Sequence, residues 1–101
     1  MTFSIVAFDK DAKEVGFAIA SCCWNAGSVC SAKAGKGVIT HQHNGDPRFH
    51  PIFFEQLNKK KNLEEILDHF RTIDDQIESR QIGFINFEKG TSLSFTGRLC
   101  K

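Results

Sequence analysis

Short apolar segments alternate with polar turns in the first part of the chain. Residues 3–8 and 15–20 are apolar, and the polar segment 9–13 between them predicts a hairpin turn. Residues 28–34 and 38–42 repeat this pattern around a glycine-containing turn. Two apolar hairpins in succession predict an antiparallel sheet whose two faces both need cover.

The middle of the chain changes to the period of an α-helix. Asp46 and Pro47 predict a helix start, with Asp as the N-cap and Pro at the first helical position. A second helix is predicted from Asn62, because Glu65 stands three residues later in the spacing of a capping box. Its apolar residues recur with helical spacing on one side, and they are Leu63, Ile66, Leu67 and Phe70.

Two more strands are predicted at the end of the chain, at residues 80–87 and 91–95, with a turn at 88–90. The predicted order is therefore ββββααββ. This order favours an α+β fold in which an antiparallel sheet carries two helices on one face. With 101 residues, we expect a single domain spanning 1–101.

Composition and charge narrow the class of protein. The chain is 41% hydrophobic, which is enough for a packed core. Its net charge is only +1 and no basic stripe is present, so nucleic-acid binding is not expected. No leader and no membrane-length apolar run is visible, so we expect a cytoplasmic protein without membrane contact.

The cysteines and histidines leave two interpretations open. Cys22, Cys23, Cys30 and Cys100 lack Cys-x-x-Cys spacing, and without a leader we interpret them as reduced thiols. The alternative is a zinc site in which His41 and His43, two residues apart on one strand face, act together with a cysteine.

The N-terminus carries the clearest candidate chemistry. Thr2 follows Met1, and a small side chain at this position normally permits removal of the initiator Met. Thr2 would then carry a free α-amine beside its own hydroxyl. An α-amine titrates near neutral pH and can accept the hydroxyl proton, so this pair forms a minimal nucleophile and base. Many proteins begin Met-Thr without any such role.

The chain also resembles the domain-of-unknown-function 1028 family in ordered blocks along its whole length. The matching blocks are Met1 to Ala7, Gly16 to Ser21, Ala26-Gly27, Ala32 to Gly35, Gly37-Val38, Gln42, Pro47 to Phe49, Pro51, Arg80-Gln81, Gly83, Phe95 to Gly97 and Cys100. The resemblance implies a fold similar to that of N-terminal nucleophile hydrolases, an αββα sandwich. It implies no secure substrate.

For the site, the resemblance implies Thr2 as the nucleophile with its own amine as the base. It suggests Lys33 as the cation beside the nucleophile, although a surface lysine on a strand is the alternative. Ser21 could orient the amine or simply form a local hydrogen bond. The remaining polar groups that could polarise an amide carbonyl or be merely solvated are Gln42, Asn44, Arg80 and Gln81.

Two departures from the family pattern bear on function. Full-length relatives continue for roughly as long again, so this chain is expected to lack the second sheet and the other helical layer. An apolar sheet face would then remain exposed, and pairing of two copies in a homo-oligomer is the simplest way to cover it. The second departure is the histidine-containing segment 40–45, where the family usually has small or aromatic residues.

Two functions of different classes follow. The first is an N-terminal nucleophile amidohydrolase that acts without a cofactor on a small amide or peptide-like bond. The second is a non-catalytic truncated remnant or an oligomeric binding domain with the same half-fold. A metal-binding domain is a third and more distant hypothesis.

Overall fold

The first two strands form a separate hairpin. The computed structural model describes residues 2–22 and 24–100. Strands β1 (Thr2–Asp9) and β2 (Glu14–Ser21) pair antiparallel, with Thr2 opposite Ser21. Half-buried and exposed residues alternate along β1, as the period of a strand requires. One face of the hairpin is therefore packed and the other is open.

The remaining described strands form a second antiparallel sheet. It consists of β3 (Cys30–Lys33), β4 (Gly37–His43), β5 (Arg80–Asn86) and β6 (Thr91–Thr96), side by side in that order. The prediction of one sheet was therefore wrong, since the described strands make two. The predicted order was also incomplete, because two short 3-10 helices, η1 (Ala26–Val29) and η2 (Ile77–Ser79), interrupt it.

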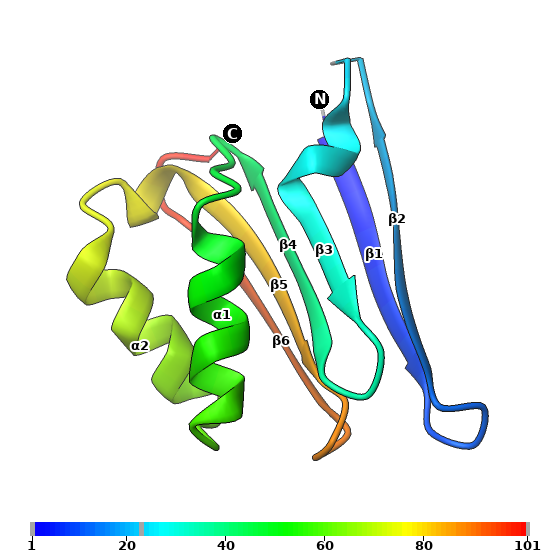
Figure 1. Cartoon of the computed structure of the whole chain (residues 1–101). Coiled ribbons are helices and arrows are strands. Elements are labelled where there is room, and N and C mark those ends of the chain that lie inside the picture. Colours follow the sequence, from blue (N-terminus) through cyan, green and yellow to red (C-terminus); the bar gives the residue numbers. More distant parts are fainter. Residues whose placement is uncertain (1, 23, 101) are drawn as a thin grey trace.

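The hairpin lies across one face of the larger sheet instead of extending its edge (Figure 1). Strand β1 contacts β4 and β5, while β2 contacts β3 and β4. Gly83 of β5 permits a close approach here: a Cβ atom at this position would lie 2.7 Å from Thr40 Oγ1 and 3.9 Å from Val6 Cγ2. Stacking in this way covers one side of the hairpin, which an edge-to-edge pairing would leave in water.

Two α-helices in the described chain cover the opposite face of the larger sheet (Figure 1). They are α1 (Phe49–Asn58) and α2 (Leu63–Ile73). The predicted apolar stripe of α2 is buried, and the Phe53 ring stacks on Phe84 of β5 with centroids 4.7 Å apart. Neither helix is long and apolar enough to cross a membrane.

The two helices begin differently. The capping box of α2 is confirmed: Glu65 N–H donates to Asn62 Oδ1 at 2.8 Å, and Asn62 N–H donates to Glu65 Oε1 at 3.1 Å. The predicted start of α1 at Asp46 was wrong, because the N-cap residue is Arg48. The Asp46 carboxylate instead accepts a hydrogen bond from Arg48 N–H in a local turn that precedes the helix.

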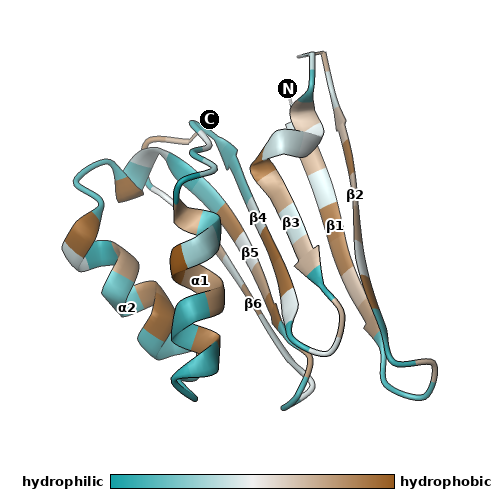
Figure 2. Cartoon of the chain, in the orientation of Figure 1, coloured by the Kyte–Doolittle hydropathy of each residue, from teal (hydrophilic) through white to brown (hydrophobic). Residues whose placement is uncertain are grey.

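The outer face of the hairpin is apolar and uncovered. Phe3 and Ile5 each expose 65% of their surface, and Ala18 and Ala20 lie across from them on β2. Figure 2 shows hydrophobic segments along both strands. Such a face on a small protein usually marks an interaction surface.

Candidate functional site

The hydroxyl groups of Thr2 and Ser21 meet at one end of the hairpin. The antiparallel register places these residues opposite each other, and both lie on the face directed at the larger sheet. Their oxygen atoms are 2.8 Å apart, which is hydrogen-bond distance. The structure therefore brings the predicted nucleophile and its predicted orienting residue together.

Two glutamines of the larger sheet join this pair. Gln42 of β4 lies opposite Gln81 of β5 in the register, and Gln42 Nε2 donates to Gln81 Oε1 at 3.2 Å. The same amide nitrogen donates to the backbone carbonyl of Thr2 at 3.3 Å. Thr2, Ser21, Gln42 and Gln81 form one group, named here the Thr2 cluster.

A cavity of about 360 Å³ is lined by residues 4–6 of β1 and by residues of β4, β5 and β6, including Gln42 and Gln81 of the Thr2 cluster. We call this cavity the polar trough. Its polar lining includes Ser4, Thr40, Gln42, Gln81, Ser94 and Thr96, together with apolar side chains from the strands. Within the described part of the chain, no charged side chain lines it. A cavity of this size is typical of small-molecule sites.

The structure does not bring Lys33 to this cluster. Lys33 pairs with Gly37 at the start of β4, whereas Gln42 stands five residues further along the same strand. That separation corresponds to roughly 17 Å. The Lys33 ammonium instead lies 4.7 Å from the centre of the Phe54 ring on α1, a cation–π contact.

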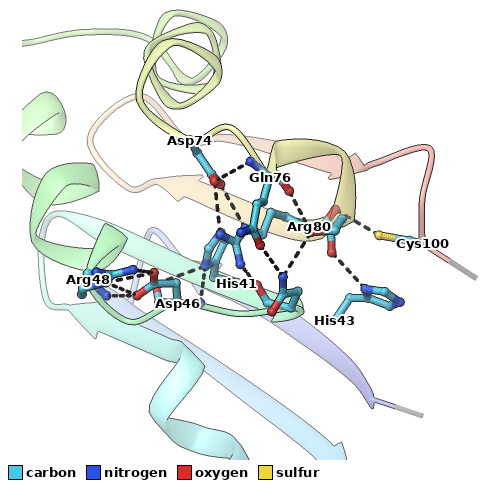
Figure 3. Close-up of polar contacts among 10 residues, drawn as sticks. His41, His43, Asp46, Arg48, Asp74, Gln76, Arg80 and Cys100 are labelled. Carbon is cyan, nitrogen blue, oxygen red and sulfur yellow. Dashed lines mark hydrogen bonds and ion pairs between the residues drawn. The ribbon is translucent and has the colours of Figure 1, made fainter.

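Asn44 and Arg80 belong to a different group. Arg80 lies on the helix side of the larger sheet, near Asp74 and Gln76 (Figure 3). Arg80 and Asp74 are both buried, and the guanidinium donates to the two carboxylate oxygens at 3.0 and 3.1 Å. Arg80 also donates to the Asn44 carbonyl, while the Asn44 side chain donates to Gln76 Oε1 at 2.9 Å. These bonds join the end of β4 to the segment before β5.

The electrostatics of this group are those of a buried ion pair. Burial alone would raise the pKa of Asp74, but hydrogen bonds from Arg80 and from Gln76 N–H, with the Arg80 charge, hold that pKa below its ordinary value. Both partners are buried and paired with each other, so we infer that Arg80 has a structural role.

His41 lies in the same layer and is fully buried. Its Nδ1 atom accepts the Asp46 N–H at 2.8 Å, so the ring proton is on Nε2. Burial lowers the pKa of His41 to about 4, and the nearby Arg80 charge adds to this effect. His41 is therefore a neutral core residue at physiological pH.

The geometry gives little support to the zinc hypothesis. His43 donates from Nδ1 to the Ser79 carbonyl at 2.9 Å, while His41 is held by Asp46. Among the described residues, no group of three or more histidines, cysteines and carboxylates is placed to hold a metal ion. Cys22, Cys30 and Cys100 are free thiols, and Cys23 lies outside the described residues.

Sequence reasoning missed the buried Asp74–Arg80 pair. Asp74 stands in the polar segment after α2, and that segment carries the pattern of a solvated connection. The one usable signal was the position of Arg80 at the start of an apolar strand, where a buried cation requires an acidic partner nearby.

The family of the chain follows from a match along almost its full length. The model of a family of unknown function, DUF1028, matches residues 2–101. The chain belongs to this family. No curated protein matches the chain.

A solved structure of another DUF1028 protein has the same fold. The chain is similar to the crystal structure of protein SPO2555 from Silicibacter pomeroyi, with a TM-score of 0.88 and 22% sequence identity. The alignment covers 99% of this chain but 45% of that protein. The chain therefore spans less than half the length of that relative, and at this identity the likeness establishes the fold alone.

Proposed function

We propose that this DUF1028 chain is an N-terminal nucleophile amidohydrolase acting on a small amide or peptide-like bond. Thr2, exposed as the first residue after removal of Met1, is the nucleophile. The observation that carries the proposal is the Thr2 cluster: the Thr2 and Ser21 hydroxyls lie 2.8 Å apart, and Gln42, which donates to the Thr2 carbonyl, lines a polar cavity of about 360 Å³. Lys33 has no part in this proposal.

The proposed reaction needs only groups at the start of the chain and one water. Thr2 Oγ1 attacks the amide carbonyl and gives its proton to the Thr2 α-amine. The carbon–nitrogen bond breaks, the leaving amine takes that proton, and an ester forms on Thr2. Water then attacks the ester, which releases the carboxylic acid and restores the hydroxyl.

The surrounding residues position these groups. Ser21 holds the Thr2 hydroxyl by a hydrogen bond, and Gln42 holds the Thr2 carbonyl. Fixing the first residue at two points directs its hydroxyl and amine, and such orientation accounts for much of the rate gain in enzymes.

The test is hydrolysis of a panel of small amides by three proteins. Wild type and the Thr2→Ser variant, which keeps a nucleophilic hydroxyl, are expected to release amine. Thr2→Ala is expected to be at least a thousandfold slower, since it lacks the attacking oxygen. Thr91→Ala, at an exposed threonine that begins β6 and lies outside the cavity lining, is the matched control and should retain most of the activity. Equal rates for wild type and Thr2→Ala would rule out the proposal.

A second candidate is a non-catalytic domain that acts through self-association. It is supported by the uncovered apolar face of the hairpin, which carries Phe3 and Ile5. This function predicts no hydrolase activity to lose in Thr2→Ala. A measured loss of hydrolysis in that variant would exclude it.

The same proposal extends to the fold and the compartment. We propose that the hairpin begins the second sheet of an αββα sandwich similar to that of N-terminal nucleophile hydrolases. Its support is the stacking of the hairpin on a sheet whose other face carries both helices.

We also propose a cytoplasmic location, which the free thiols of Cys22, Cys30 and Cys100 favour.

A further inference from the structure

Gln42 has a buried acceptor atom that no other described group satisfies. Its Nε2 atom makes two hydrogen bonds, to the Thr2 carbonyl and to Gln81 Oε1. Its Oε1 atom is buried and has no hydrogen-bond partner within the described part of the chain. The reverse orientation of the amide would place that oxygen against the Thr2 carbonyl, which is another acceptor.

An unsatisfied buried acceptor is costly, so this atom calls for a donor. Gln42 lines the polar trough, and a ligand there could supply an N–H. The opposite wall is formed by β6, where Ser94 and Thr96 lie across from Gly83 and Gln81 in the register. Hydroxyl groups both donate and accept, so they suit the remaining atoms of an amide.

None of the described residues that line the trough carries a charge, which favours an uncharged ligand. A carboxylate or ammonium entering the trough would lose hydration without meeting an opposite charge, which is strongly unfavourable. An uncharged polar molecule loses much less hydration free energy when it enters the trough. The volume of about 360 Å³ is that of a small-molecule site.

We propose that the polar trough binds an uncharged small molecule through a carboxamide group whose N–H donates to Gln42 Oε1. This deepens the proposed function and rests on it for the assignment of that molecule as the substrate. Gln42 also donates to the Thr2 carbonyl, so the proposed binding residue is in direct contact with the residue that carries the nucleophile.

The test is an NMR titration of the Thr2→Ala protein, which cannot consume the ligand. The probe is succinamide, and the control is succinate, which has the same skeleton with two negative charges. Succinamide is expected to shift the side-chain amide signals of Gln42 in a saturable manner, while succinate does not. Gln42→Met is expected to bind succinamide about tenfold more weakly, as the loss of one buried hydrogen bond predicts.

Several results would overturn this proposal: no response to succinamide, an equal response to succinate, or unchanged binding by Gln42→Met. If Gln42→Met does not fold, Ser94→Leu on exposed β6 serves instead, and unchanged succinamide binding there is equally contradictory. Succinamide binding without amide hydrolysis by wild type would overturn the proposed function alone. Hydrolysis without succinamide binding would overturn the trough proposal alone.

Discussion

Neighbouring residues of one strand lie in two different chemical environments. Gln42 of β4 faces the hairpin and the polar trough, whereas His41 faces the helices and is buried against them. On β5 the same alternation separates Gln81 from Arg80. This follows from the two-residue period of a strand, and it assigns each residue to a site or to the core.

Asp74→Asn tests the structural role given to Arg80. The substitution leaves the guanidinium buried without its charged partner, so the free energy of unfolding should fall by about 3–5 kcal/mol. Asp75→Asn is the matched control, because the Asp75 carboxylate is next in the sequence but exposed. This substitution should change the free energy of unfolding by less than about 0.5 kcal/mol. Urea denaturation measures both. Equal effects of the two substitutions would contradict the buried pair.

His41 makes stability depend on pH. The unfolded chain binds a proton on this ring below pH 6.5, but the folded chain does so only below about 4. The free energy of unfolding should therefore rise between pH 4 and 6.5, by about 3 kcal/mol from this group, and level off above. Burial also lowers the pKa of His50, which adds to the same trend. Urea denaturation across this range should show a smaller rise for His41→Gln, and an unchanged rise would refute the assignment.

Strand pairing and register also explain which site residues could be predicted from the sequence. Thr2 and Ser21 meet because Thr2 is the first residue of β1 and Ser21 is the last residue of β2, and these strands pair antiparallel. The apolar pattern of the sequence identifies both strands. Gln42 and Asn44 are only two positions apart in the sequence and were both predicted for the site. The chain turns after β4, however, and the Asn44 side chain contacts Gln76 instead. The position of Lys33 depended on strand register, which hydrophobic pattern alone does not define for a short strand such as β3.

The two helices depend on different forces. Helix α2 begins at a capping box, a local signal that the sequence contains in full. Helix α1 has no side-chain cap and is held by the packing of Phe53 and Phe54 in the core. Its start was therefore predicted two residues early, because the tertiary contacts that define it are not visible in local sequence.

Asn62→Ala should destabilise the protein by about 1 kcal/mol, since it removes the side-chain oxygen that accepts from Glu65 N–H. Asn58→Ala provides the control, as Asn58 is an exposed residue at the end of α1. Thermal unfolding followed by circular dichroism compares the two. A loss for Asn58→Ala as large as that for Asn62→Ala would show that the capping box is not responsible.

The unusual feature of this fold is a hairpin that is covered on one side only. The sequence predicts both strands of the hairpin, but stacking and edge pairing bury similar residues, so pattern alone could not separate one sheet from two. The outcome leaves Phe3 and Ile5 in water, next to the end of the hairpin that carries Thr2.

If two copies cover this face, Ile5→Asp should dissociate them. Wild type is then expected to show twice the monomer mass in size-exclusion chromatography with light scattering, and Ile5→Asp the monomer mass, because a buried unpaired carboxylate is strongly unfavourable. Ala12→Asp in the exposed hairpin turn adds the same charge and should keep the wild-type mass. Identical masses for wild type and Ile5→Asp would remove this face as an interface between copies.

The proposed function requires that Thr2 is an activated N-terminal nucleophile. The most direct measurement is the mass of the N-terminal peptide after treatment with a small β-lactone, an electrophile that opens on an activated hydroxyl. The expected result is a peptide that begins at Thr2 and carries one acyl group, which is absent from Thr2→Ala. A peptide that retains Met1, or an unmodified Thr2 after prolonged treatment, would contradict it.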